Sequence, residues 1–129
     1  MCRAAEQKTK KRKAVIVGET GELQVGNKLG RIYAVLEEIH RLATGTAFSP
    51  ATYDGAISSP AVKFAELIKK ANHDHLPELK PNDKERLNRL LTGAMNALDA
   101  DPFPQHLDVD QQERFVLSMQ AQKAAFVSA

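Results

Sequence analysis

Residues 29–43, LGRIYAVLEEIHRLA, decide the fold that this sequence predicts. Their apolar side chains recur at intervals of three, three, one, three, three and one, which is the spacing of one helix face and not the alternation of a strand. These apolar residues are Leu29, Ile32, Val35, Leu36, Ile39, Leu42 and Ala43. A helix of this length is seldom stable alone in water. The apolar stripe therefore requires a partner surface, and the later segments each offer one.

Length and composition indicate one globular domain. The chain has 129 residues, of which 43% are hydrophobic, enough to build a core. It has no apolar run near the ~20 residues that a membrane span needs. The single cysteine, Cys2, cannot form a disulfide within the chain. We therefore expect a cytoplasmic protein with no membrane partner.

The charge is divided unevenly along the chain. Residues 1–13 carry six basic and one acidic side chain, a net charge of +5, and the remainder carries twelve basic and fifteen acidic side chains, a net charge of −3. The basic arm includes Lys10, Lys11, Arg12 and Lys13. Such arms commonly bind phosphate backbones without regard to sequence, but a solvated tail has the same composition.

The segment after this arm allows a small β-hairpin. Residues 14–18 (AVIVG) and 23–25 (LQV) are β-prone, and a glycine-containing turn separates them. We therefore divide the chain into a basic arm with this hairpin, residues 1–27, and a helical domain, residues 28–129. An isolated hairpin is marginal in water, so it would have to lean on the helices or on another protein.

Helix boundaries follow from capping residues. The first helix should end near Thr44-Gly45 and be followed by a loop over residues 46–57, in which Tyr53 is expected to pack rather than to stack on a base. A second helix should begin at Ser58-Ser59-Pro60, with its apolar stripe on Ala61, Phe64, Ala65, Ile68 and Ala71.

Two further helices have the signature of a capping box. Asn82 with Glu85 announces the third, whose stripe is Leu87, Leu90, Leu91, Ala94, Met95 and Leu98. Asp108 with Gln111 announces the fourth, whose stripe is Val109, Gln112, Phe115, Val116 and Met119. Gln112 should hydrogen-bond to a neighbouring backbone. The sequence therefore predicts an all-α protein, an irregular four-helix bundle.

No constellation of residues suggests an enzyme. The serines lie at helix starts and in loops, and the adjacent carboxylates Glu37 and Glu38 look solvent-facing rather than like a paired acid and base. His73 and His75 could supply two metal ligands, but no cysteine cluster accompanies them, so we expect neither metal nor cofactor. Aromatic residues make up only 5% of the chain, which disfavours a base-stacking platform.

Basic side chains on the predicted helices suit contact with a nucleic-acid backbone. The candidates in the helical domain are Arg31, Arg41, Lys63, Lys69, Lys70, Arg86 and Arg89. Some of them must pair within the protein, for example Arg41 with Glu37 or Glu38.

Several segments resemble one known family in order and spacing. Residues 30–37, GRIYAVLE, resemble the G-R-L-F-A-V-L-E opening of the small subunit of type I-C CRISPR effector (Cascade) complexes, a domain also found as the C-terminal part of the large subunit. Tyr53, residues 58–61 (SSPA) and His75-Leu76 are similar to its second-helix region. Residues 103–115 are similar to its F-P-x-H-L…Q…F segment. The family's G-Y-Y-H-Q is replaced by residues 118–122, and residues 1–27 lie outside the resemblance.

The resemblance implies a non-catalytic role in the antiviral defence of a prokaryotic cell, within its cytoplasm. In such complexes, base pairing with RNA reads the target sequence and protein charges hold the strands. The implied partners are the backbone and large subunits, the crRNA, the target and non-target DNA strands, and further copies of the chain. The alternative from another class is a helical protein–protein adaptor whose basic arm is only a tail.

Overall fold

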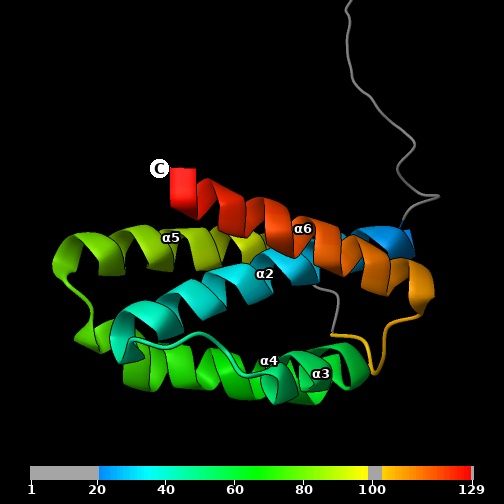
Figure 1. Ribbon diagram of the computed structural model, residues 1–129, viewed down its shortest axis with the longest axis horizontal. Helices are drawn as coiled ribbons and strands as arrows, with labels where there is room; N and C mark the ends of the chain where they lie inside the picture. Colours follow the sequence, from blue (N-terminus) through cyan, green and yellow to red (C-terminus); the bar gives the residue numbers. More distant parts are fainter. Residues whose placement is uncertain (1–20, 99–102, 129) are drawn as a thin grey trace, which may run out of the picture.

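The structure is a computed structural model that describes residues 21–98 and 103–128. Over these residues it has five α-helices and no strand, which confirms the all-α class (Figure 1). The helices are α2 (Gly21–Thr44), α3 (Pro50–Ser58), α4 (Pro60–Lys70), α5 (Pro81–Ala97) and α6 (Val109–Ser128). A π-helical turn, η2 (Ala71–His75), and a short 3-10 helix, η3 (Leu76–Glu78), extend α4. None of the described helices combines the length and the apolar character needed to cross a bilayer.

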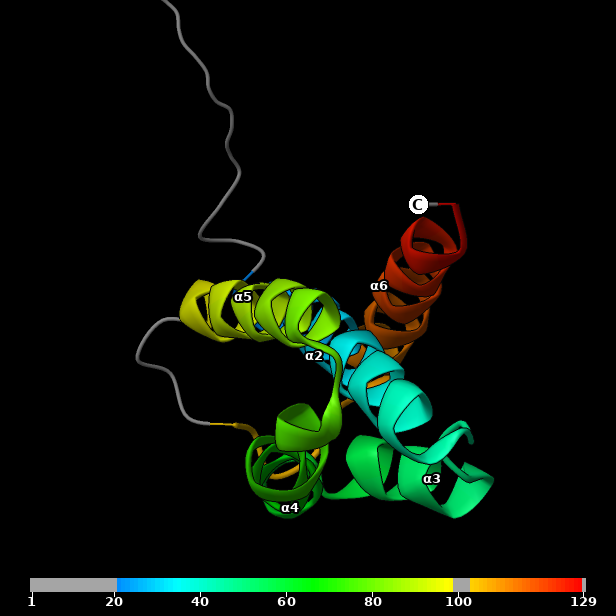
Figure 2. The same cartoon turned by 90° about the vertical axis from the view of Figure 1, so that its left-hand side faces the viewer.

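Helix α2 is the central element of the fold. In Figure 2, α5 and α6 flank it on two sides, and α3 and α4 lie beneath it. Residues 32–36 are each at most 2% exposed, although five consecutive helical positions point in every direction around the axis. The predicted stripe was therefore too narrow over these residues, where α2 is buried all round. It was wrong at Leu42, which is 36% exposed near the end of the helix.

Two glycines one turn apart let α6 lie directly against α2. A Cβ atom at Gly26 would overlap the carbonyl oxygen of Gln111, and one at Gly30 would overlap that of Phe115. The Ser118 hydroxyl donates a hydrogen bond of 2.6 Å to the carbonyl of Asn27 across the same interface. The absence of side chains at both glycines therefore sets the distance between the two helices.

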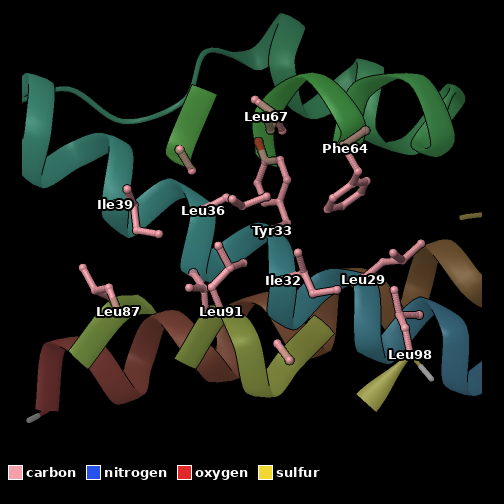
Figure 3. Packing of buried hydrophobic residues seen from close by; sticks show 14 of the residues in the cluster. Leu29, Ile32, Tyr33, Leu36, Ile39, Phe64, Leu67, Leu87, Leu91 and Leu98 are labelled. Atoms are coloured by element: carbon pink, nitrogen blue, oxygen red, sulfur yellow. The ribbon is translucent and has the colours of Figure 1, made fainter. Parts of the chain in front are cut away.

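The core contains a cluster of aromatic rings around α2. The Tyr33 ring lies 5.4 Å from the Phe115 ring, 6.4 Å from the Phe64 ring and 6.0 Å from the Tyr53 ring, centroid to centroid. Figure 3 shows α4 facing one side of α2 through Phe64 and Leu67, and α5 facing the other through its leucines. The prediction that Tyr53 packs is confirmed.

Local chemistry explains where the helices end. Gly45 adopts φ of 85°, and its N–H bonds to the Arg41 carbonyl at 2.8 Å, which confirms the predicted end of α2. At the start of α6, Asp108 Oδ1 accepts from the Gln111 N–H at 2.9 Å, and Gln111 Oε1 accepts from the Asp108 N–H at 3.2 Å. The Gln112 amide donates to the Leu107 carbonyl at 2.8 Å, also as predicted.

The predicted hairpin is wrong in the part that can be compared. Residues 23–25 belong to the first turns of α2, and Val25 packs against the core. Residues 14–18 lie outside the described residues. The division at residues 27 and 28 stays a prediction, and α2 runs across that position without a break.

The predicted loop over residues 46–57 is also wrong, because most of it is α3. Pro50 occupies the first turn, where a missing N–H costs little, and the Ser49 hydroxyl caps the helix by accepting from the Thr52 N–H at 3.2 Å. Helix α3 has Ala56 as its only fully buried residue within the part described. It therefore lacks the repeating apolar stripe by which the other helices were recognised.

Three smaller predictions about helix faces and caps need correction. Helix α5 begins at Pro81, one residue before Asn82, and no side chain caps it, so the Asn82–Glu85 capping box does not form. Ala65 is exposed, and Leu67 is buried in its place on α4. Val109 is 78% exposed, whereas Gln111 in the same turn of α6 is 7% exposed and lies against Gly26 of α2.

Candidate nucleic-acid interface

The predicted basic candidates are spread over three helices. Helix α2 carries Arg31 and Arg41, α4 carries Lys63, Lys69 and Lys70, and α5 carries Arg86 and Arg89. Lys10, Lys11, Arg12 and Lys13 lie outside the described residues. The candidates that the structure describes therefore lie on three separate helices.

On α4, one glutamate lies between two of the lysines. Glu66 Oε1 is 3.3 Å from Lys63 Nζ, and Glu66 Oε2 is 3.9 Å from Lys70 Nζ. Lys69 is exposed and makes no ion pair with any residue that the structure describes. The three lysines and Glu66 together carry a net charge of +2.

On α5, each arginine pairs with a carboxylate one turn earlier. Arg86 Nη2 lies 3.3 Å from Asp83 Oδ1, and Arg89 Nη2 lies 3.2 Å from Glu85 Oε2. Both pairs are exposed, and such pairs contribute only about 0–1 kcal/mol. These guanidinium groups can therefore exchange a carboxylate for another anion at small cost.

The two candidates on α2 differ in their surroundings. Arg41 pairs with Glu38 through Nε at 3.1 Å and Nη2 at 2.8 Å, as predicted, and this hydrogen-bonded carboxylate raises the pKa of Arg41. Arg31 is exposed and has no ion pair within the described part of the chain. Among the candidates within the described residues, Arg31 and Lys69 are therefore the two without an ion-pair partner there.

Glu37 contradicts the prediction that the adjacent carboxylates face solvent. It is 8% exposed, its Oε2 accepts the Phe48 N–H at 3.1 Å, and its Oε1 lies 3.0 Å from Lys123 Nζ. Oε1 has no aligned hydrogen-bond donor among the described residues, so its interaction with Lys123 is mainly Coulombic. This ion pair links α2 to α6. Lys123 therefore has a structural role, which the spacing of residues in the sequence did not indicate.

The two histidines considered as metal ligands are separated by the fold. His75 turns inward, where its Nε2 lies 3.4 Å from Nδ1 of His40, and His73 is exposed. Burial, His75 and Lys70 lower the pKa of His40, with Glu37 opposing them. No group of three metal-ligating side chains occurs over residues 21–98 and 103–128. The absence of a metal or cofactor stays a prediction.

The fold and these surfaces define a class of small all-α protein, with a buried central helix and with basic side chains displayed on the helices around it. Comparison with known protein families identifies the family to which the chain belongs. The model of the family described as CRISPR-associated protein (Cas_Csd1) matches residues 1–127, so the chain belongs to this family and is a type I-C Cascade-related CRISPR protein. The match includes residues 1–27, which the sequence resemblance left outside. No curated protein matches the chain significantly.

Proposed function

We propose that this protein is a non-catalytic small subunit of a type I-C Cascade complex that binds the DNA backbone without sequence preference. In that role it stabilises the R-loop by holding the displaced strand. The observation that carries the proposal is its membership of the Cas_Csd1 family, together with the exposed cations on α2, α4 and α5.

The arrangement of charge supports contact with phosphates rather than recognition of bases. Arg31 and Lys69 are exposed without a described carboxylate partner, and Arg86 and Arg89 have only weak exposed pairs. Cations on separate helices can follow a strand's backbone, whereas base readout requires side chains converging on base edges. Sequence recognition is left to the guide RNA, as in other RNA-guided complexes.

The proposal is tested by co-purification with a crRNA-loaded complex of the backbone and large subunits. We expect the tagged chain to enter the complex and to tighten its binding to target DNA. Each lost phosphate contact should reduce the slope of log K against log salt by about 0.7 for a single strand. A complex that excludes the chain, or a DNA affinity insensitive to salt, would refute this function.

Single substitutions give a sharper version of the same test. Arg31→Gln and Lys69→Gln should each weaken DNA binding by the assembled complex, because these cations have no competing carboxylate in the described structure. Arg41→Gln removes the same charge from a site where Glu38 already neutralises it, and it serves as the matched control. Equal effects of all three changes would contradict the assignment of Arg31 and Lys69.

A protein–protein adaptor is the second candidate, and the surface of α6 favours it. Leu117 is 59% exposed and Val127 is 87% exposed on this helix. Removing residues 1–13 and neutralising the α4 lysines distinguishes the two functions. An adaptor keeps its activity, whereas a strand-holding subunit still assembles but no longer tightens DNA binding.

A further inference from the structure

A hollow of about 310 Å³ lies between the C-terminal half of α2, the segment that follows it and α4. We call it the α2–α4 cavity. The three helices α2, α3 and α4 meet on this side of the molecule in Figure 2. Leu36 and Leu67 form part of its apolar lining, and most of its remaining walls carry hydrogen-bonding or charged groups. It is thus a concave site of mixed character.

Two lysines of the predicted set, Lys63 and Lys70, line this cavity together. Lys63 and Lys70 both reach it from α4, with Glu66 between them. The Lys63 side chain is 26% exposed, and its stem lies against α3 at Gly55, where a Cβ atom would be 2.6 Å from Lys63 Cε. The missing side chain at Gly55 therefore leaves the space in which Lys63 is held beside the cavity.

Hydroxyl and imidazole groups complete the polar wall. The Ser49 and Thr52 hydroxyls lie 3.1 Å apart at the start of α3, and Thr46 Oγ1 lies 3.5 Å from Nε2 of His40. His75 faces the same cavity. These groups approach from α2, from the segment before α3, and from η2. Donors converging from several directions suit a tetrahedral oxyanion better than a planar or apolar ligand.

We propose that the α2–α4 cavity binds a phosphate group of a single-stranded nucleic acid, with Lys63 and Lys70 supplying the positive charge. This inference rests on the proposed function and gives one phosphate of the strand a definite position. The phosphate replaces the Glu66 carboxylate as the partner of both ammonium groups. This exchange costs little because the side chains of Glu66 and Lys70 are 48% and 57% exposed.

The test is an NMR titration of the full chain with three separate ligands: a ten-residue oligothymidylate, thymidine monophosphate and inorganic phosphate. We expect the oligonucleotide to shift the ring signals of His40 and His75 and to bind at least tenfold more tightly than the small anions. A bound phosphate also opposes the influence of Lys70, so the pKa of His40 should rise. Small anions that bind as tightly as the oligonucleotide would overturn the assignment to a strand.

Matched variants distinguish binding at the α2–α4 cavity from non-specific attraction of the oligonucleotide to the protein's positive charge. Lys63→Gln with Lys70→Gln should weaken oligonucleotide binding about tenfold or more. Lys80→Gln with Lys84→Gln removes the same charge from exposed positions in and beside the first turn of α5, and should weaken it no more than about threefold. Equal losses, or an oligonucleotide that binds without shifting either histidine, would overturn the proposal. Melting temperatures of the variants verify that each is folded.

Failure of the phosphate-site inference can be distinguished from failure of the proposed small-subunit function. If the complex carrying Lys63→Gln and Lys70→Gln still holds DNA as tightly as the unmodified complex, the cavity is not a strand site and the small-subunit function stands. If the unmodified chain neither joins the complex nor affects its DNA binding, the function itself fails, whatever the NMR titration shows.

Discussion

Substitution of Gly30 by alanine tests whether close approach of α6 to α2 organises this fold. Two effects oppose each other. Alanine favours a helix interior by about 1 kcal/mol over glycine. Its Cβ would, however, overlap the Phe115 carbonyl oxygen, a backbone atom that cannot rotate away. Overpacking of this kind costs about 1–3 kcal/mol, and we expect the upper part of that range. The net expectation is a loss of about 1–2 kcal/mol.

The same substitution at Gly93 of α5 is the matched control. A Cβ atom there meets nothing within 4 Å, so only the gain in helix propensity remains and the protein should be stabilised by about 0.5–1 kcal/mol. Urea unfolding followed by circular dichroism measures both changes. The reasoning is refuted if Gly30→Ala is as stable as the wild type, or if the two variants change stability in the same direction.

Three further outcomes follow from the contacts described. Asp108→Ala removes the acceptor for the Gln111 N–H and should cost about 1 kcal/mol in urea unfolding; an unchanged midpoint would show that the cap is not stabilising. Phe64→Ala leaves a hole in a site that is 0% exposed and should cost about 3–5 kcal/mol, so a loss below about 1 kcal/mol would contradict the described packing. Because burial lowers the pKa of His40, the unfolded chain takes up a proton more readily than the folded one, and stability should fall as the pH drops below about 6.5. His40→Asn should lessen the difference between urea midpoints at pH 7.5 and pH 5.5, and an unaltered difference would exclude His40 as its source.

Apolar periodicity predicted the helices that bury a repeating stripe. It identified residues 29–43 of α2 and the C-terminal part of α5, because the same side chains that define the period also fill the core. It missed the first two turns of α2, which begins at Gly21. It missed α3, which has one fully buried residue in the described part and owes its start to Ser49 and Pro50. A nine-residue helix held by a cap and by a few partly buried side chains leaves little periodic signal.

The candidate interface was predictable in residue type but not in arrangement. The lysines and arginines could be identified from the sequence, and the Arg41–Glu38 ion pair was expected because residues three apart are neighbours on a helix. Glu37 could not be recognised as buried, since its partners come from residues 48 and 123 rather than from its own helix. The cavity likewise depends on bringing His40 beside His75, a contact between residues 35 positions apart.

The pairing of α2 with α6 has a consequence for how the protein is made. The hydrogen bond between Asn27 and Ser118 joins residues 91 positions apart, so a ribosome adding about 5–20 residues per second needs roughly 5–18 s to supply the second after the first. During that interval the glycine-lined side of α2 has no covering helix, and its exposed apolar surface is open to association with other chains. Helix α2 is synthesised before α6 but stays partly uncovered until α6 has been synthesised and packs against it. Newly synthesised chains are therefore vulnerable to aggregation during this interval.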